Sequence, residues 1–417
     1  MTSPPAKRPA DVTLDQPIKV VHLITSLDIG GAEMMLYKLL SGQSAGRSAG
    51  RSASRPLDNV VICLTKSGPL AEKIFALGIP VYSLEMSQGR PTPVRLAVAF
   101  LRLFKRLRQE QPVILQTWLY HADLLGTLVA PLVGSPLLLW NIRNSSLDFS
   151  QYRRLTGWII RLCALLSKRP YLILTNSDAG RIFHTEMGYR AGNWLLIPNG
   201  INTTQYKPDP EAYAEVRQEL GLALDTPLIG LVARFDPQKD HYTFIQAARQ
   251  LSEVCPQAHF ILAGKGLDSQ NSKVVEWISA GGFTGGEEAG LSKKIHLLGL
   301  RHDITRITAA LDLATSSSCF GEGFPNVIGE AMACGIPCVV TDVGDSRLIV
   351  GETGKVVPAR DPQALAKAWQ EYLELPKAER QSIGERARLR VERLYSIEEV
   401  VSRYTKLYEE LGRAKTR

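Results

Sequence analysis

The feature that most constrains the fold is an alternation of short apolar segments with helical ones, which is interrupted once. It begins with "IKVVHLITS" (18–26), followed by a Gly-rich turn and helical spacing in "EMMLYKLLSG". The same order restarts after "PNGINTTQYKPDP" (198–210), a Pro/Gly/Asn-rich run suited to a linker. Buried strands that alternate with helices favour parallel sheets with helices on both faces. The sequence therefore predicts an α/β protein with two doubly wound halves joined by one linker.

Apolar content and Gly or Pro boundaries place the individual segments. The further strands expected are 59–65, 80–86, 228–234, 259–266, 294–300 and 338–344. The further helices expected are 68–78, 93–110, 151–170, 242–254 and 326–334, with a charged, helix-rich end at 377–417. Two segments are interpreted as irregular. The repeat "SAGRSAGRSASR" (44–55) predicts a mobile loop, and 268–292 predicts an insertion.

Length and charge set bounds on function. A chain of 417 residues is too long for one ordinary core, which favours two domains. Residues 1–205 carry 23 Lys and Arg against 12 Asp and Glu, a net charge of +11, whereas the other 212 residues carry 26 against 29, a net charge of −3. This asymmetry indicates that the first half meets a phosphate-bearing substrate or a membrane surface. Nucleic acid would also fit the charge, but no nucleic-acid-binding motif accompanies it, so nucleic acid is not expected as a partner.

The cysteines and the N-terminus bear on the compartment. The six cysteines form no C-x-x-C pair and have no histidine at zinc-ligand spacing. This pattern predicts a reduced cytosolic protein with buried thiols. Residues 1–17 lack an apolar core, so they are not expected to be a signal peptide and are interpreted as a disordered tail.

Three segments of the first half raise the question of a membrane. Residues 124–142 carry no charge over 19 residues, close to the length of a membrane span. Two glycines and two prolines interrupt them, so a helix, a Gly-Ser-Pro turn and a buried strand are expected instead. Helices 93–110 and 151–170 are basic and amphipathic. Helix patterning favours a core-facing apolar stripe with a solvated basic face, and a peripheral contact with anionic lipid is the alternative.

Two cations follow a predicted strand, at the edge where doubly wound sheets bind ligands. Arg234 ends "LIGLVAR", and Lys239 follows five residues later, with Pro237 shaping the turn. Arg can bind phosphate through two nitrogens at once, and Lys acts as a mobile point charge. The pair would suit a diphosphate, although the spacing alone leaves open two ordinary surface cations.

The stretch "FGEGFPNVIGEAMACGIPCVV" (320–340) places one glutamate before a predicted helix and another inside it. The letters FPN begin the helix, and Gly335 and Pro337 end it. The amide groups at such a start attract phosphate. Glu330, about one turn in, would hold a ribose hydroxyl pair. Glu322 would lie beside the reacting sugar of a nucleotide-sugar, or would only set the geometry of the turn.

These motifs resemble those of the family 4 retaining glycosyltransferases, which have the GT-B fold of two Rossmann-like domains facing across a cleft. The second half carries "VARFDPQKD", "LAGKG", "LGLRHDI" and "SSSCFGEGFPNVIGEAMACGIPCVVTDVGDSRLIV". The first half carries "TSLDIGGAEMML", "LYHADLLG", "NIRNS", "TNSDAG" and "IPNGIN" in the family's order. The resemblance implies an acceptor-binding domain over 18–199, a nucleotide-sugar-binding domain over 200–394, and a C-terminal helix, 395–417, that returns to the first domain.

The resemblance also implies a role for each matching residue in a donor site between the halves. Arg234 and Lys239 would bind the diphosphate, and Glu330 the ribose. Glu322 would lie near the transferred sugar, and His121 matches the family's histidine beside that sugar, so these two are the catalytic candidates. The other implied positions are Phe324, Pro325, Asn326, Val327 and Gly264 around the donor, Leu300 and Ile304 beside the base, and Gly30, Gly31 and Arg143 toward the acceptor or a phosphate.

The implied reaction is hexosyl transfer from a nucleotide-diphosphate-sugar, UDP-sugar first among them, with retention at the anomeric carbon. A retaining enzyme with a nucleophile needs two carboxyls about 5 Å apart at that carbon. One glutamate is assigned to the ribose, so front-face attack is favoured, with the leaving phosphate taking the acceptor proton. The cations and the helix start would stabilise the charge on that phosphate. No Asp-x-Asp segment occurs, and neither a metal nor another cofactor is expected.

Other functions remain as alternatives. An epimerase or phosphorylase of the same fold would form product without a glycosyl acceptor or would depend on inorganic phosphate. A dinucleotide-dependent dehydrogenase would need G-x-G-x-x-G after the first strand, which "LDIGGAEMM" does not match. A non-enzymatic membrane scaffold would have no use for the donor site.

The basic first half suits a polyprenyl-diphosphate- or lipid-linked saccharide at the inner membrane face as acceptor. Such an acceptor belongs to bacterial surface polysaccharide assembly. A soluble sugar phosphate is the alternative acceptor.

Overall fold

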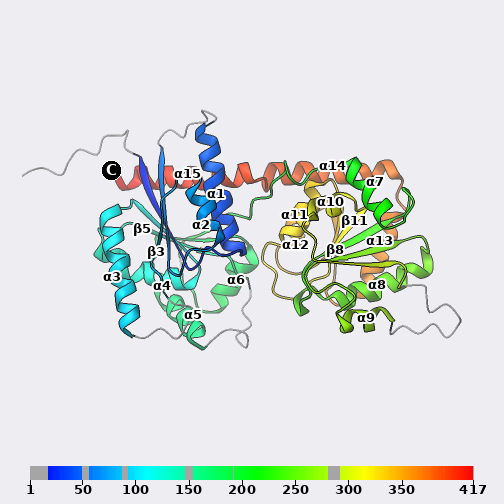
Figure 1. Cartoon of the computed structure of the whole chain (residues 1–417), viewed down its shortest axis with the longest axis horizontal. Helices are drawn as coiled ribbons and strands as arrows, with labels where there is room; N and C mark the ends of the chain where they lie inside the picture. The colour runs from blue at the N-terminus through cyan, green and yellow to red at the C-terminus, as the bar shows by residue number, and fades with distance from the viewer. Residues whose placement is uncertain are drawn as a thin grey trace, which may run out of the picture.

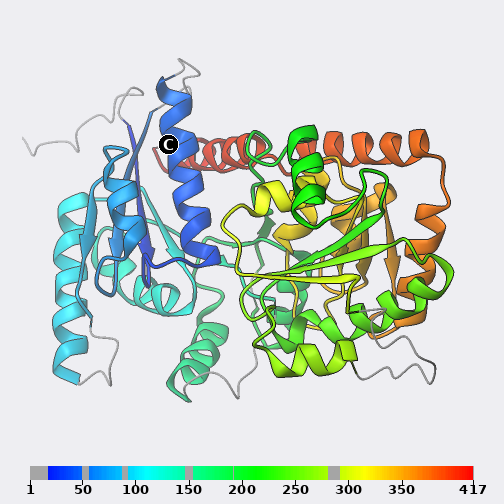
Figure 2. The same cartoon turned by 45° about the vertical axis from the view of Figure 1, so that its right-hand side comes forward.

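The computed structural model describes residues 17–48, 56–86, 93–145, 154–190, 192–279 and 292–416. Within them the chain forms two parallel sheets that lie side by side, the first blue to green and the second green to orange (Figure 1). The last two helices run one after the other along the same side of both halves, as Figure 2 shows from a second direction. The predicted tail 1–17, apart from Pro17, lies outside the described residues.

The first sheet has seven strands in the order β3-β2-β1-β4-β5-β6-β7, and every neighbouring pair is parallel. The chain starts at the centre and winds outward in both directions, which is the doubly wound arrangement. The strands are β1 (Ile18–Ile24), β2 (Leu57–Cys63), β3 (Val81–Ser83), β4 (Ile114–Trp118), β5 (Leu137–Ile142), β6 (Leu172–Thr175) and β7 (Trp194–Leu196). The helices are α1 (Gly31–Ser48), α2 (Pro69–Phe75), α3 (Pro93–Glu110), α4 (Tyr120–Val129), η1 (Ala130–Leu132), α5 (Arg154–Leu166) and α6 (Asp178–Glu186).

The second sheet has six strands in the order β10-β9-β8-β11-β12-β13, again all parallel. Its strands are β8 (Leu228–Val232), β9 (His259–Ala263), β10 (Ile295–Gly299), β11 (Leu313–Ser316), β12 (Cys338–Thr341) and β13 (Gly354–Val357). Its helices are α7 (Pro210–Glu219), η2 (Pro237–Lys239), α8 (His241–Val254), α9 (Ser272–Ser279), α10 (Ile304–Ala309), α11 (Asn326–Ala333), α12 (Ser346–Val350), η3 (Gly351–Thr353), α13 (Pro362–Leu373) and α14 (Lys377–Leu394). The chain ends in α15 (Ile397–Thr416).

Helices cover both faces of each sheet, which explains why the strands are apolar throughout. Every residue of β4 is buried, and so is all but one residue of β1. On one face of the first sheet, α1, α2 and α15 form a common core, to which α15 contributes Tyr404 and Tyr408. On the other face, α3, α4 and α5 pack against the same strands. The last helix of the chain therefore belongs to the core of the first sheet.

Most predicted elements are confirmed. The helix 93–110 has the predicted bounds, and 124–142 contains the end of α4, η1 and β5, as expected. Within the described part of the chain, no helix is long and apolar enough to cross a bilayer. The six cysteines are free, but Cys255 and Cys319 are partly exposed, so the prediction of buried thiols holds for the other four.

Three predictions were wrong in part. Residues 44–48 of the repeat, predicted as a loop, continue α1, because α15 packs along that helix, and 49–55 lie outside the described residues. The insertion 268–292 contains the helix α9, whose Val274 and Ile278 are buried in the core of the second sheet. The outward side of α5 exposes Leu155, Trp158, Leu162 and Leu165 beside Arg161, where a solvated basic face was favoured.

Candidate active site

The two halves contact each other through the loops that follow their strands. The hydroxyl of Ser145, after β5, donates to the carbonyl of Gly321, after β11, at 3.0 Å. The carboxylate of Asp345, after β12, accepts from the amides of Asp178 (2.8 Å) and Ala179 (3.0 Å) at the start of α6. The carboxyl ends of both sheets therefore face one another, and loops in this position form the ligand sites of doubly wound folds.

The loop after β8 carries the two predicted cations. The guanidinium of Arg234 donates to the Asp236 carboxylate from two nitrogens, at 3.0 and 2.8 Å, and its side chain is 61% exposed. Arg has five N–H donors, so three remain for a ligand. The same Asp236 accepts from the amide of Gln238 at 2.9 Å and begins the turn η2, which ends at Lys239. The turn thus presents Arg234 to solvent and directs Lys239 inward.

Lys239 and Glu322 form an ion pair that joins the loops after β8 and β11. Glu322 is 7% exposed, and its carboxylate also accepts from the Ser318 hydroxyl at 2.6 Å. The backbone carbonyl of Lys239 accepts from Ser317 at 2.7 Å, so the two loops are joined by more than the charges. Removing a carboxylate from water is favourable only when it is paired and hydrogen-bonded, and both conditions hold here. The structure therefore holds Glu322 beside Lys239.

Gly264 lets the loop after β9 pass close behind the Arg234 loop. Its φ is +152°, and a Cβ at this position would lie 1.9 Å from the carbonyl oxygen of Ala233. The Gly264 amide donates to the carbonyl of Gly299 at 2.8 Å. No side chain fits between these two backbone segments, so the loop after β9 packs directly against Ala233, the residue before Arg234.

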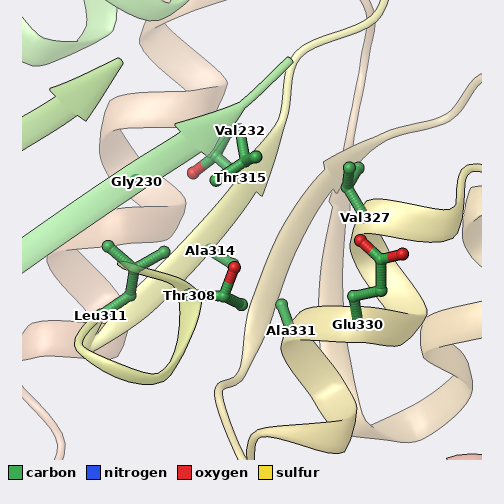
Figure 3. Close-up of a pocket in the computed structure, with 9 residues that line it drawn as sticks. All are labelled: Gly230, Val232, Thr308, Leu311, Ala314, Thr315, Val327, Glu330 and Ala331. Carbon is green, nitrogen blue, oxygen red and sulfur yellow. The ribbon is translucent and has the colours of Figure 1, made fainter. Parts of the chain in front are cut away.

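Glu330 lies on α11 at the edge of a small cavity between that helix and the second sheet. Figure 3 shows its carboxylate beside Val327, opposite Val232 on β8 and Thr315 on β11. Burial raises the pKa of the Glu330 carboxyl, and the nearby Lys38 ammonium and a hydrogen bond from the Tyr206 hydroxyl oppose that rise. The Glu330 carboxylate thus lies between the ends of β8 and β11 in the second sheet and the Lys38 ammonium group of the first half.

Lys38 comes from α1 and also donates to the carbonyl of Gly200, at 3.2 Å. Burial lowers the pKa of its ammonium group, and Glu330 opposes that change. Sequence reasoning did not select Lys38, because nothing local to "LYKLL" distinguishes it from a surface lysine of an amphipathic helix. Only the contact across 162 residues places it at the junction of the halves.

Arg143 lies in the junction between the halves. It donates to Asn141 at 3.1 Å and to the Tyr404 hydroxyl at 3.3 Å, and it contacts the Asn199 side-chain oxygen. Burial lowers the pKa of its guanidinium group. Asn199 in turn donates to Asn326 at the start of α11, at 2.7 Å. The predicted acceptor residue therefore connects, through one amide side chain, to the predicted phosphate-binding helix.

The remaining first-half candidates lie at helix starts above the first sheet. Gly30 and Gly31 lead from β1 into α1; a Cβ on Gly31 would meet nothing within 4 Å, whereas a Cβ on Gly30 would lie 2.4 Å from the Glu33 carboxylate. His121 lies in the first turn of α4, directly after the strand β4, and burial lowers the pKa of its imidazole. Leu119, which precedes that turn, has a φ of +67°, which is uncommon for leucine and re-aims the chain there.

The other donor candidates surround α11 and α10. The ring of Phe324 is buried against Tyr395, with ring centres 5.3 Å apart, and Pro325 caps α11. Leu300 is exposed after β10, and Ile304 begins α10 and packs on the core of the second sheet. The structure therefore brings Arg234, Lys239 and Glu322 into one cluster and Glu330, Asn326 and Arg143 into a second. Leu300, in the loop after β10, and Ile304, at the start of α10, lie outside both clusters.

Within the described ranges, no three His, Cys, Asp or Glu side chains come together as a set that could hold a metal ion.

Comparison with known proteins agrees with this geometry. A family model described as "Glycosyl transferases group 1" matches residues 226–374, which contain both clusters' second-half residues. An Escherichia coli UDP-Gal:alpha-D-GlcNAc-diphosphoundecaprenol alpha-1,3-galactosyltransferase is 24% identical over 330 residues, covering 76% of this chain and 81% of its own. The lipopolysaccharide core biosynthesis mannosyltransferase LpsB of Rhizobium meliloti is 27% identical over 307 residues, covering 70% and 80%.

The fold has a counterpart among solved structures. Anabaena HepE in complex with UDP is 21% identical, covers 94% of this chain and 100% of its own, and superposes with a TM-score of 0.76. Two facing Rossmann-like halves with these site loops define a GT-B glycosyltransferase. The second half carries the group 1 glycosyltransferase domain, and the chain resembles glycosyltransferases of the family 4 type. The relatives named here are transferases, which favours transfer over the epimerase and phosphorylase alternatives.

Proposed function

We propose that the protein transfers a hexosyl group from a UDP-sugar to a saccharide carried on a lipid diphosphate, in the assembly of a bacterial surface polysaccharide. The observation that carries the donor side is the pair of cations, Arg234 and Lys239, in the loop after β8, next to Glu322 and the start of α11. The names of the relatives support the acceptor, since one acts on a diphosphoundecaprenol-linked sugar and another in lipopolysaccharide core synthesis. The Anabaena neighbour binds UDP and, in a second complex, UDP-glucose.

The reaction proceeds with retention and by front-face attack. The bond from the anomeric carbon to the diphosphate oxygen breaks, a bond from that carbon to the acceptor oxygen forms, and the acceptor proton goes to the departing phosphate. Arg234 and Lys239 stabilise the charge that builds on that phosphate, so the reaction needs no metal. Glu322, held by Lys239 and Ser318, lies beside the sugar, and Glu330 accepts from the ribose. His121 faces the sugar from the first half.

Calorimetric titration with UDP tests the donor site, with GDP and NAD as comparison ligands. Wild type should bind UDP saturably, and Glu330→Ala should weaken binding at least tenfold, or about 1.4 kcal/mol. Glu211→Ala, an exposed carboxylate in the first turn of α7, is the matched control and should bind as wild type does. Binding that is indifferent to Glu330, or specific to NAD, would refute the donor assignment.

Two further measurements test retention of the anomeric configuration and independence of metal ions. The anomeric configuration of the product, read by nuclear magnetic resonance, should equal that of the donor, and inversion would refute retention. Transfer in the presence of a chelator should match transfer without it, and a loss that added Mg²⁺ restores would refute metal independence. Product formed from UDP-sugar alone would favour the epimerase instead.

A further inference from the structure

The outward side of α5 is largely apolar, although the helix lies on the surface of the first half. Its inward residues, Ile159, Ile160 and Cys163, are buried in the core, as expected for a helix that covers a sheet. The residues that face away from the sheet include exposed apolar side chains, Trp158 by 61% and Leu165 by 80%, with the exposed Arg161 between them. A surface helix of a soluble domain normally carries charged and polar residues on this side. The described part of the chain does not cover these apolar side chains.

The neighbouring helices extend this surface. α4 packs against both α3 and α5, and all three helices cover the same face of the first sheet. Exposed apolar side chains also occur on α3, α4 and η1, and we call the whole set the apolar face. It comprises Val98, Leu101, Leu128, Leu132, Leu155, Trp158, Leu162 and Leu165. Exposed apolar residues of the second half are spread over several elements, with at most two on any one of them, so the concentration on this side is not a general property of the surface.

A groove adjoins the apolar face at the end of α5. It has a volume of about 480 Å³ and lies between η1, the start of β5 and the last turn of α5. Leu128, Leu137 and Leu166 line it, together with the exposed side chains of Arg169 and Tyr171. Apolar side chains beside an exposed cation and phenol match a lipid chain whose charged headgroup stays in water.

The charges around the apolar face are positive. The described basic side chains on α3, α5 and the turn after α5 are Arg102, Lys105, Arg106, Arg108, Arg161, Lys168 and Arg169. The acidic residues of these segments and of α4 are Glu110, which pairs with Lys19 and Arg106, and Asp123, which is buried beside Thr117. Glu85, after β3, pairs with Arg102. The guanidinium of Arg161 lies 5.4 Å from the centre of the Trp158 ring, the placement of a cation beside an aromatic group at a membrane interface.

We propose that the apolar face is a docking surface for an anionic bilayer, into which Trp158, Leu162 and Leu165 insert while the surrounding Lys and Arg contact lipid phosphates. Insertion of an amphipathic helix face together with basic residues is the usual combination for reversible membrane binding. The inference deepens the proposed function, on which its biological purpose rests, because it brings the cleft to the surface where a lipid-linked acceptor lies. It also explains the excess of positive charge in the first half.

Vesicle binding tests the inference without using the donor site. The probes are phosphatidylcholine vesicles with and without phosphatidylglycerol, at low and high salt, and binding is measured by co-flotation. Wild type should bind the anionic vesicles, and binding should weaken as salt screens the basic residues. Trp158→Ser/Leu165→Ser should reduce the binding constant at least tenfold. The matched control, Leu224→Ser/Val254→Ser, removes two exposed apolar residues of the second half, each 61% exposed, and should leave binding unchanged.

The outcomes separate this inference from the proposed function. Glu330→Ala should bind vesicles as wild type does, and Trp158→Ser/Leu165→Ser should bind UDP as wild type does. Wild type that does not bind anionic vesicles, or a double variant that binds them equally, would overturn the docking surface and leave the donor site intact. If only the control variant lost binding, the surface would lie on the second half, which also overturns the inference. Retained vesicle binding without UDP binding would instead refute the proposed function alone.

Discussion

At the scale of single residues, the site depends on charges that are paired inside the protein before any ligand arrives. Glu322 is almost fully buried, and Lys239 and Ser318 supply its partners. A buried ion pair of this kind contributes little net stability, but removing one partner leaves the other charge uncompensated. The pair therefore holds the geometry of two loops more than it stabilises the fold.

A double-mutant cycle on the pair measures this. Lys239→Met leaves the Glu322 carboxylate buried without its cation and should lower the free energy of unfolding by about 3 kcal/mol. Adding Glu322→Gln removes the unpaired charge and should restore much of that loss, as read from urea denaturation. UDP binding should stay weak in both variants, because the cation is absent from both. If the stability losses of Lys239→Met and of Glu322→Gln, each measured alone, simply added in the double variant, the ion pair would not be the cause of the Lys239→Met loss.

His184 makes the stability of the protein depend on pH. Its Nδ1 is 2.7 Å from the Gly180 carbonyl and its Nε2 is 2.8 Å from the Tyr120 hydroxyl, a set of partners that suits the neutral ring. Burial lowers its pKa from 6.5 to about 4. The unfolded chain therefore binds the proton more readily between these two values. Stability from this residue is complete above pH 6.5 and is lost as the pH falls toward 4.

The size of this effect follows from the shift. Between pH 7 and pH 5, wild type should lose about 2 kcal/mol of unfolding free energy through His184 alone. His184→Gln cannot take up this proton, so its loss over the same range should be smaller by about that amount, by urea denaturation at each pH. Equal slopes for the two proteins would show that His184 titrates alike when folded and unfolded.

At the scale of elements, the strand-end loops determine where the functional groups point, and their backbones pack too closely for most side chains. Gly264 shows this most clearly, because a Cβ there would lie 1.9 Å from the Ala233 carbonyl, next to Arg234. Gly221 offers a matched control, since its φ is +67° but a Cβ there would meet nothing within 4 Å. The two positions separate the cost of an unusual backbone conformation from the cost of displacing the loop.

Gly264→Ala should therefore cost more than Gly221→Ala. The control should lose about 1 kcal/mol of stability from its left-handed backbone alone. Gly264→Ala adds a clash with backbone, so we expect a loss of about 3 kcal/mol together with weaker UDP binding, because Arg234 moves with its neighbour. Thermal unfolding and calorimetry provide the two readouts. Equal losses in the two variants, with UDP affinity preserved, would contradict the tight approach of these loops.

Local signals allowed prediction of the elements and of the motif residues, but not of what connects them. Arg234 and Lys239 could be selected because a recognisable strand precedes them. The strands β6 and β11 were not predicted from the sequence, and each has only four residues. The end of α1 was missed because its Ser and Gly residues favour a loop, whereas Gly42 packs on Val401 of α15. Lys38, Asn199 and Asp345 were missed since their partners lie more than 100 residues away.

At the scale of the whole molecule, Asp345 connects the relative position of the halves to the loop that holds Glu322. Its carboxylate accepts from the first two amides of α6, in the first half. Its own amide donates to the Gly323 carbonyl at 2.9 Å, and a Cβ on the preceding Gly344 would lie 2.4 Å from the Glu322 carbonyl oxygen. A carboxylate at a helix start gains from both the free amides and the helix dipole. Contact between the halves and the geometry around Glu322 are therefore joined through one residue.

Replacing Asp345 should consequently affect turnover more than donor binding. Asp345→Ala should lower kcat at least tenfold and raise the radius of gyration in solution scattering, because the halves lose their contact at α6. UDP affinity should change less than twofold, since the proposed donor residues all lie in the second half.

Asp361→Ala is the control, because Asp361 caps α13 through the amide of Ala364 at 2.9 Å within one half. Both substitutions remove a helix cap worth about 1 kcal/mol, so stability alone cannot separate them. If kcat fell equally in both variants, or in neither, Asp345 would be an ordinary helix cap. The relative position of the halves would then depend on the other contacts between them.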